Sequence, residues 1–154
     1  MEAITTENSI IINRPIEEVF DTATCMESCI NWWTMVQEAK KITPGPIAVG
    51  TEYQHIGRYM GMTMEAHPIV SALESPHHFA YTSDTPTADM VVDYHFEPAD
   101  GGTKMSMTMV ANPKEGIIDE AMAGQMMDGF SRQFQSDMLN LKGMMEGGVK
   151  VKLW

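Results

Sequence analysis

The spacing of the apolar residues changes near residue 113, and this change constrains the fold more than any other feature of the chain. Segments 89–97 and 103–111 alternate apolar and polar residues, as half-buried strands do. The intervening 98–102, Pro-Ala-Asp-Gly-Gly, is typical of a hairpin turn with two glycines to take positive φ. From 114 to about 146 the apolar spacing becomes three to four, which predicts one long helix. The chain is therefore predicted to be α+β, with an antiparallel sheet packed against a C-terminal helix.

The N-terminal half supplies the remaining predicted elements. A first strand is expected at 9–12, a short helix begins near Pro15 and continues to Ala23, and a second helical piece is expected at 26–34. Further strands are expected at 51–59, at 60–74 as one or two strands bent near Pro68, and at 79–83, while the tail 149–154 could add a short strand. The apolar stripe of the long helix consists of Ile118, Met122, Met126, Phe130, Phe134, Leu141 and Met145.

Length and charge limit the classes of function. A chain of 154 residues is the size of one domain, so residues 1–154 are treated as a single domain. The net charge of −11 argues against nucleic-acid binding and against an anionic membrane surface, because both need clustered basic residues. No apolar segment is long enough for membrane insertion, and the N-terminus lacks the pattern of a secretory signal. Cys25 and Cys29 are interpreted as reduced thiols, so we expect a cytoplasmic protein.

Methionine and tyrosine gather on the predicted inner faces of the sheet and the helix. Methionine adapts to irregular shapes, and a few polar groups in an apolar cleft are typical of a ligand site. The alternative is that the sixteen methionines simply fill a solid core. The candidate ligand-binding residues are Tyr53, His55, Tyr59, Tyr81, Tyr94, Met105, Met107, Met109, Met122, Met126 and Phe130.

His55 is the candidate catalytic residue, because an imidazole can act as a general acid or base near neutral pH. The alternative is a structural histidine whose ring is satisfied by a tyrosine hydroxyl or a water. The chain contains no His-Glu-x-x-His, Gly-x-Ser-x-Gly or Gly-x-Gly-x-x-Gly motif, and no three ligands share a metal-binding spacing. We therefore expect no metal and no cofactor, and few carboxylates in the interior.

Several local motifs, taken in order, resemble one superfamily across nearly the whole chain. They are the run from Ile12 to Asp21, Trp32 or Trp33 with Val36, 44–46 with 49–51, 74–81, and 94–98 with 101–104. The sequence resembles the START-like or SRPBCC superfamily of polyketide cyclase/dehydrase-like proteins. The resemblance implies the helix-grip fold, in which a curved antiparallel sheet wraps around a long C-terminal helix, with two short helices after the first strand. It also implies a ligand cavity, but no single activity.

The sequence is compatible with three functions. The first is binding of a small apolar or aromatic molecule, such as a lipid, a polyketide-like metabolite or an isoprenoid. The second is a cyclase or dehydratase acting on such a ligand without a metal, with His55 and a tyrosine moving protons. The third is a protein-interaction module like the co-chaperone branch of the superfamily. The sequence leaves open whether the chain is a monomer or a homodimer.

Overall fold

A computed structural model describes residues 2–59 and 61–147, and the possible strand at 149–154 lies outside them. The described elements follow the predicted order, with one strand that the sequence did not predict. They are β1 (Ile4–Ile12), α1 (Ile16–Ala23), a 3-10 helix η1 (Cys29–Asn31), β2 (Val36–Lys41), β3 (Tyr53–Tyr59), β4 (Met62–Glu74), β5 (His78–Asp84), β6 (Ala88–Ala99), β7 (Gly102–Pro113) and α2 (Glu120–Glu146).

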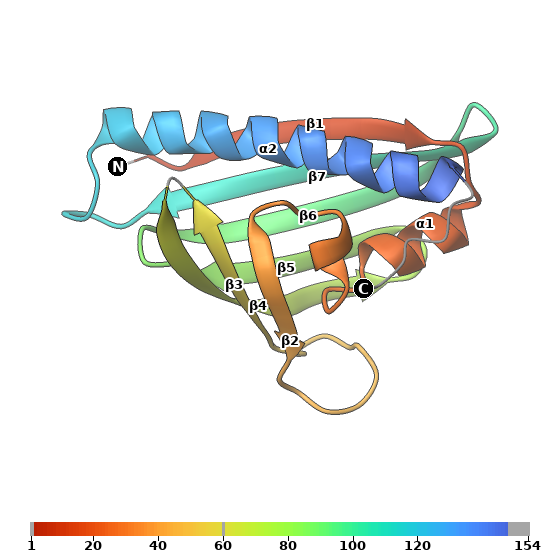
Figure 1. Cartoon of the computed structure of the whole chain (residues 1–154), viewed down its shortest axis with the longest axis horizontal. Helices are drawn as coiled ribbons and strands as arrows, with labels where there is room; N and C mark the ends of the chain where they lie inside the picture. The colour runs from red at the N-terminus through yellow and green to blue at the C-terminus, as the bar shows by residue number, and fades with distance from the viewer. Residues whose placement is uncertain (1, 60, 148–154) are drawn as a thin grey trace.

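The seven strands form one antiparallel sheet in the order β1-β7-β6-β5-β4-β3-β2. Figure 1 shows this sheet curving, with α2 lying along it beside β1 and β7. The predicted α+β helix-grip architecture is thereby confirmed. The inner face of the sheet is buried at the alternating positions that the sequence predicts, including Tyr94 opposite Met107 and Val92 opposite Met109. These side chains form the core between the sheet and the long helix.

The β6–β7 hairpin differs in one detail from the prediction. Asp100 and Gly101 are the two residues with positive φ, at 46° and 78°, rather than the two glycines. Gly102 already belongs to β7, and a Cβ atom there would lie 2.4 Å from the carbonyl oxygen of Ile12. The second glycine is therefore needed for the close approach of the chain before α1, and not for the turn itself.

Helix α2 begins later than predicted and is rotated relative to the predicted stripe. It starts at Glu120 instead of residue 114, and the Asp119 carboxylate caps it by accepting a hydrogen bond from the Met122 backbone N–H at 2.7 Å. Ala123 and Met127 are buried in its first half, whereas Met122 is 49% exposed. The prediction that Met122 faces inward is wrong. In the first half of the helix the buried residues lie one position later, and each position turns the helix by about 100°.

Two further local differences concern the segment after α1. The second predicted helix, 26–34, is reduced to the single turn of η1. The following strand β2 was missed because its sequence, Val-Gln-Glu-Ala-Lys-Lys, is mostly charged and polar. Such a composition is typical of an edge strand, where charged side chains prevent pairing with another chain.

Hydrogen bonds fix α2 against the β1 edge of the sheet. The Asn8 side chain bonds the Ser131 hydroxyl at 3.3 Å, and the Lys142 ammonium donates to the Ile11 carbonyl at 2.5 Å. At the C-terminal end of α2, the Glu146 carboxylate accepts a hydrogen bond of 2.8 Å from the Asn13 backbone N–H. These contacts place the inner face of α2 opposite the centre of the sheet. None of the helices within the described residues is long and apolar enough to cross a membrane.

Candidate functional site: a cavity between the sheet and the long helix

A cavity of about 130 Å³ lies between the inner face of the sheet and α2. Its wall is formed by residues of β2 to β7, by Trp33 after η1, and by Phe130, Phe134 and Asp137 of α2. Most of this wall is apolar or aromatic. Such a composition, with a small number of polar groups, is the usual makeup of a small-molecule site.

Trp33 joins the helix side of the cavity to the sheet side. Its ring centroid lies 6.0 Å from that of Phe134 on α2, 5.6 Å from that of His55 on β3 and 6.5 Å from that of Tyr81 on β5. The contacts with Phe134 and His55 are edge-on, the arrangement that aromatic rings prefer. From the sequence, this tryptophan is expected in the helix at 26–34 and in a family motif, and the structure places it in the cavity wall.

The cavity is partly open, and its wall is most exposed where β2, β3 and β4 lie side by side. Val36, Gly57 and Met64 line it there and are half-buried, and the neighbouring Arg58 is exposed. A Cβ atom at Gly57 would lie 2.2 Å from the Met35 carbonyl oxygen, so glycine lets the backbones approach closely in this part of the wall. Arg58 follows Gly57 on β3 and is the one lysine or arginine among the described residues of the cavity wall.

His55 is 4% exposed and lines the cavity. Its Nε2 atom lies 3.9 Å from the Cys29 thiol, and its ring donates a hydrogen bond to the Met26 carbonyl. Burial lowers the pKa of His55 to about 4 and raises the pKa of the Cys29 thiol well above its usual range. Both groups are therefore uncharged at neutral pH, unlike the thiolate and imidazolium of a reactive cysteine pair.

Asp137 is the polar group of the wall that sequence analysis missed. It is fully buried, and its Oδ1 atom accepts hydrogen bonds from the Thr34 backbone N–H at 3.2 Å, the Thr34 hydroxyl at 3.0 Å and the Gln133 amide at 3.2 Å. Its buried Oδ2 atom has no hydrogen-bond partner among the described residues. Burial raises the pKa of this carboxyl, and the three hydrogen bonds only partly oppose that effect.

Three buried tyrosines lie on the sheet side of the cavity region. Burial raises the pKa of Tyr53 to about 12, and it raises the pKa values of Tyr81 and Tyr94 further. The Tyr94 hydroxyl has no partner at hydrogen-bond geometry among the described residues, although it lies close enough to the Tyr81 hydroxyl to perturb its ionisation. These tyrosines are neutral at physiological pH and can offer only hydroxyl hydrogen bonds.

The candidate ligand-binding residues divide into groups by position. His55, Tyr81, Met109 and Phe130 line the cavity. Tyr53, Tyr94, Met105 and Met107 are fully buried but lie outside its wall, so they support it from the core. Met126 lines a separate hollow of about 20 Å³ together with Phe130, while Met122 is exposed. The side chain of Tyr59 lies outside the described part of the chain.

A curved antiparallel sheet that holds a long C-terminal helix over an internal cavity defines the class of helix-grip domains. The chain belongs to the polyketide cyclase / dehydrase and lipid transport family, whose model matches residues 3–146. The predicted superfamily resemblance is thereby confirmed. A comparison with curated protein sequences finds no match.

Solved structures share the fold at low sequence identity. The Zhui aromatase/cyclase from Streptomyces sp. R1128 is 13% identical with a TM-score of 0.81, over 94% of this chain and 94% of that one. A START superfamily protein from Mycobacterium smegmatis is 8% identical with a TM-score of 0.78, over 94% and 99%. The major latex-like protein 151 of Panax ginseng is 10% identical with a TM-score of 0.73, over 93% and 97%. At these identities the likeness concerns the fold alone.

Proposed function

We propose that the protein binds a small, mainly aromatic molecule in the cavity between the sheet and α2. The main support for this proposal is the composition of the cavity wall, which includes the aromatic side chains of Trp33, Phe130, Phe134 and Tyr81. Flat aromatic ligands gain dispersion energy and ring contacts from such walls. Family membership adds support, since the family description names polyketide cyclases and lipid transport.

The volume favours one ligand class over another. A cavity of about 150 Å³ holds a molecule the size of benzene, and this one measures about 130 Å³. A compact aromatic ligand therefore fits with small movements of Met90 and Met109, which line the wall and have flexible side chains. A long acyl chain would need a larger rearrangement, so a compact aromatic ligand is favoured over a lipid.

A cyclase or dehydratase is the second candidate function, and one observation favours it. His55 and Asp137 both lie in the cavity wall, and burial moves their pKa values in opposite directions. Groups whose pKa values are separated by their surroundings are typical of acid–base sites. A neutral imidazole could accept a proton, and a protonated Asp137 carboxyl could donate one. The interaction-module alternative gains no support from the cavity.

Fluorescence titration with the neutral dye N-phenylnaphthylamine tests the proposal. We expect saturable binding of one dye per chain with an increase in fluorescence, and displacement by naphthol-sized competitors at lower concentrations than by palmitate. Preferential displacement by palmitate would contradict the aromatic class. If the dye does not bind and no competitor raises the melting temperature, the binding proposal is wrong. The acid–base alternative requires in addition that His55→Ala lowers turnover of a reactive ligand by roughly 10²–10⁴-fold.

A further inference from the structure

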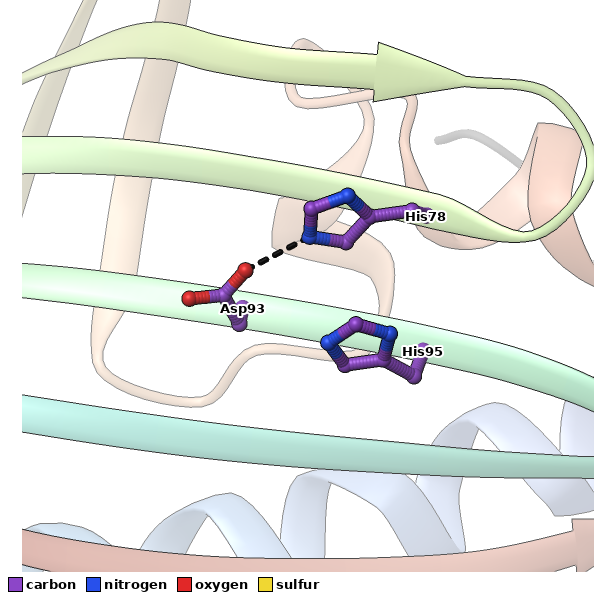
Figure 2. Close-up of side chains that lie close together, drawn as sticks. All are labelled: His78, Asp93 and His95. Atoms are coloured by element: carbon purple, nitrogen blue, oxygen red, sulfur yellow. Dashed lines mark hydrogen bonds and ion pairs between the residues drawn. The ribbon is translucent and has the colours of Figure 1, made fainter.

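The outer face of the sheet, opposite the cavity, carries a group of three potential metal ligands. His78 lies on β5, and Asp93 and His95 lie on β6 (Figure 2). His78 and His95 are direct partners in the β5–β6 register, and Asp93 shares the face of His95 because it is two residues away. The adjacent Phe79 and Tyr94 are buried in the core, which confirms that the three side chains point outward.

The three side chains lie close enough to share one ion. Each offers one nitrogen or oxygen atom, and these three atoms all lie within 4.8 Å of one another. The Nε2 atom of His78 is 2.6 Å from the Asp93 carboxylate, and the rings of His78 and His95 stack with centroids 4.4 Å apart. Zinc bonds to nitrogen and oxygen are about 2.0–2.2 Å long, so tetrahedral ligand atoms are about 3.4 Å apart. The observed positions can reach that geometry by movement of side chains alone.

The required movement can come from His95. The two rings are nearly parallel, 9° apart, so both cannot direct a nitrogen lone pair at one ion without one ring turning. His95 is exposed, and the ring torsion of histidine is broad, so this rotation costs little. The His78–Asp93 hydrogen bond is then exchanged for two metal bonds. The strands that carry all three residues stay paired throughout.

Glu74 lies beside the ring nitrogen of His78 that would not bind the metal. Its carboxylate lies 3.5 Å from Nδ1 of His78, on the side of the ring away from the Asp93 contact at Nε2. Histidines that bind metals almost always present their second ring nitrogen to a carboxylate, a carbonyl or a water, which fixes the ring and raises its basicity. The net charge of −11 also favours the approach of cations.

We infer that His78, Asp93 and His95 bind a divalent transition-metal ion of the zinc class. Two imidazoles and one carboxylate suit zinc, cobalt, nickel or copper, whereas magnesium and calcium prefer oxygen ligands alone. Three protein ligands leave a fourth position for a water molecule. Sequence analysis predicted no metal because His78 lies 15 residues before Asp93, and only the strand register brings them together. The Asp93-x-His95 spacing was the available signal.

Isothermal titration of the chelator-treated 154-residue chain with zinc chloride tests this inference. We expect one ion per chain. His78→Ala, His95→Ala and Asp93→Asn should each weaken binding at least about tenfold, and Glu74→Gln should weaken it by up to about tenfold as a positioning residue. His67→Ala is the matched control, because His67 is an exposed histidine that also faces a carboxylate, Glu65, at 3.5 Å. That variant should bind zinc like the wild type.

Cobalt absorption gives a second readout that separates this site from the thiols. Cobalt bound by nitrogen and oxygen shows visible d–d bands without sulfur charge-transfer absorption, and this spectrum should disappear in His95→Ala. Circular dichroism of each variant checks that the sheet is intact. The inference is overturned if zinc does not bind, if His95→Ala and Asp93→Asn retain full affinity, or if Cys25→Ser removes the binding. Dye binding in the cavity should be unchanged in all three ligand variants, so the two proposals can fail separately.

Discussion

The Nε2 atom of His55 lies 3.9 Å from the Sγ atom of Cys29, and burial keeps both groups uncharged. This contact joins β3 to η1. The ring of Trp33 also packs edge-on against that of His55. A charged imidazole at this place would be poorly solvated because His55 is buried, and no carboxylate among the described residues offsets that cost. Protonation of His55 is therefore coupled to unfolding.

The first prediction follows from the lowered pKa of His55. The folded pKa of about 4 lies below the ordinary 6.5, so the unfolded chain binds the proton more tightly. The contribution of His55 is complete above about pH 6.5 and is lost as the pH falls towards 4, by about 3 kcal/mol in total. Urea unfolding of the wild type and of His55→Gln, at several values from about pH 7 to pH 4, measures it.

The difference between the two proteins isolates His55 from other titrating groups. His55→Gln should be less stable at neutral pH, because it loses packing, but its stability should fall less on acidification. His67→Gln serves as a control for the same change at an exposed position, and it should alter stability at neutral pH by less than about 0.5 kcal/mol. Parallel curves for the wild type and His55→Gln would show that His55 is not buried as a neutral group.

The second prediction concerns Asp137. Its raised pKa means that the folded state binds the proton more tightly than the unfolded state, so stability declines as the pH rises through that pKa. Asp137→Asn keeps an acceptor for Thr34 and removes the buried charge, so it should stabilise the protein at about pH 8 by about 1–3 kcal/mol. Chemical denaturation at about pH 5 and pH 8 measures the gain, which should be larger at the higher pH.

Asp128→Asn is the matched control for this change, because Asp128 is exposed on the same helix. Its effect should stay within about 0.5 kcal/mol. A large loss of stability in Asp137→Asn at the higher pH would mean that the ionised carboxylate is stabilised in the folded protein. The account of a desolvated, partly unsatisfied Asp137 would then be wrong.

The fold was predictable from the sequence wherever periodicity decides which face is buried. Alternation identified the inner faces of β3, β6 and β7, and the Pro-Ala-Asp-Gly-Gly segment identified the hairpin. In the first half of α2, the predicted buried face was displaced by one residue. The prediction started from Ile118, which precedes the Asp119 cap and is not helical. An apolar period of three to four residues does not identify the buried face of a helix when the first residue counted lies outside that helix.

The site was less predictable, for a different physical reason. The predicted stripe of α2 has no member between Phe134 and Leu141, and Asp137 occupies that inward position. The gap was a usable signal, but a polar residue there breaks the apolar pattern that identifies a buried face. Trp33 follows an irregular segment, whose side-chain directions have no period at all. Methionines of the packed core and methionines of the cavity wall follow the same alternating spacing along the strands. Spacing alone therefore could not distinguish the two groups.

The third prediction concerns Arg58 in the cavity wall. Its guanidinium should attract the anionic dye anilinonaphthalene sulfonate but not the neutral N-phenylnaphthylamine. Arg58→Gln should therefore weaken binding of the anionic dye by up to about fivefold, the range of an exposed ion pair. Binding of the neutral dye should be unchanged, and added salt should reduce the difference. Lys40→Gln, on the exposed face of β2, is the control. Equal weakening of both dyes would show that Arg58 shapes the wall instead of supplying charge.

The central claim is that the space between the sheet and α2 is an open ligand cavity rather than a filled core. Ala66 lines this cavity on β4, and the next residue, His67, is exposed on the opposite face of the same strand. The most direct measurement is neutral-dye affinity together with urea stability for Ala66→Phe, with His67→Phe as the matched control. We predict that Ala66→Phe weakens dye binding at least about tenfold and changes stability by less than about 1 kcal/mol, while His67→Phe binds dye normally. A wild type that takes up no dye, with an Ala66→Phe variant destabilised by about 1–3 kcal/mol through overpacking, would contradict the claim.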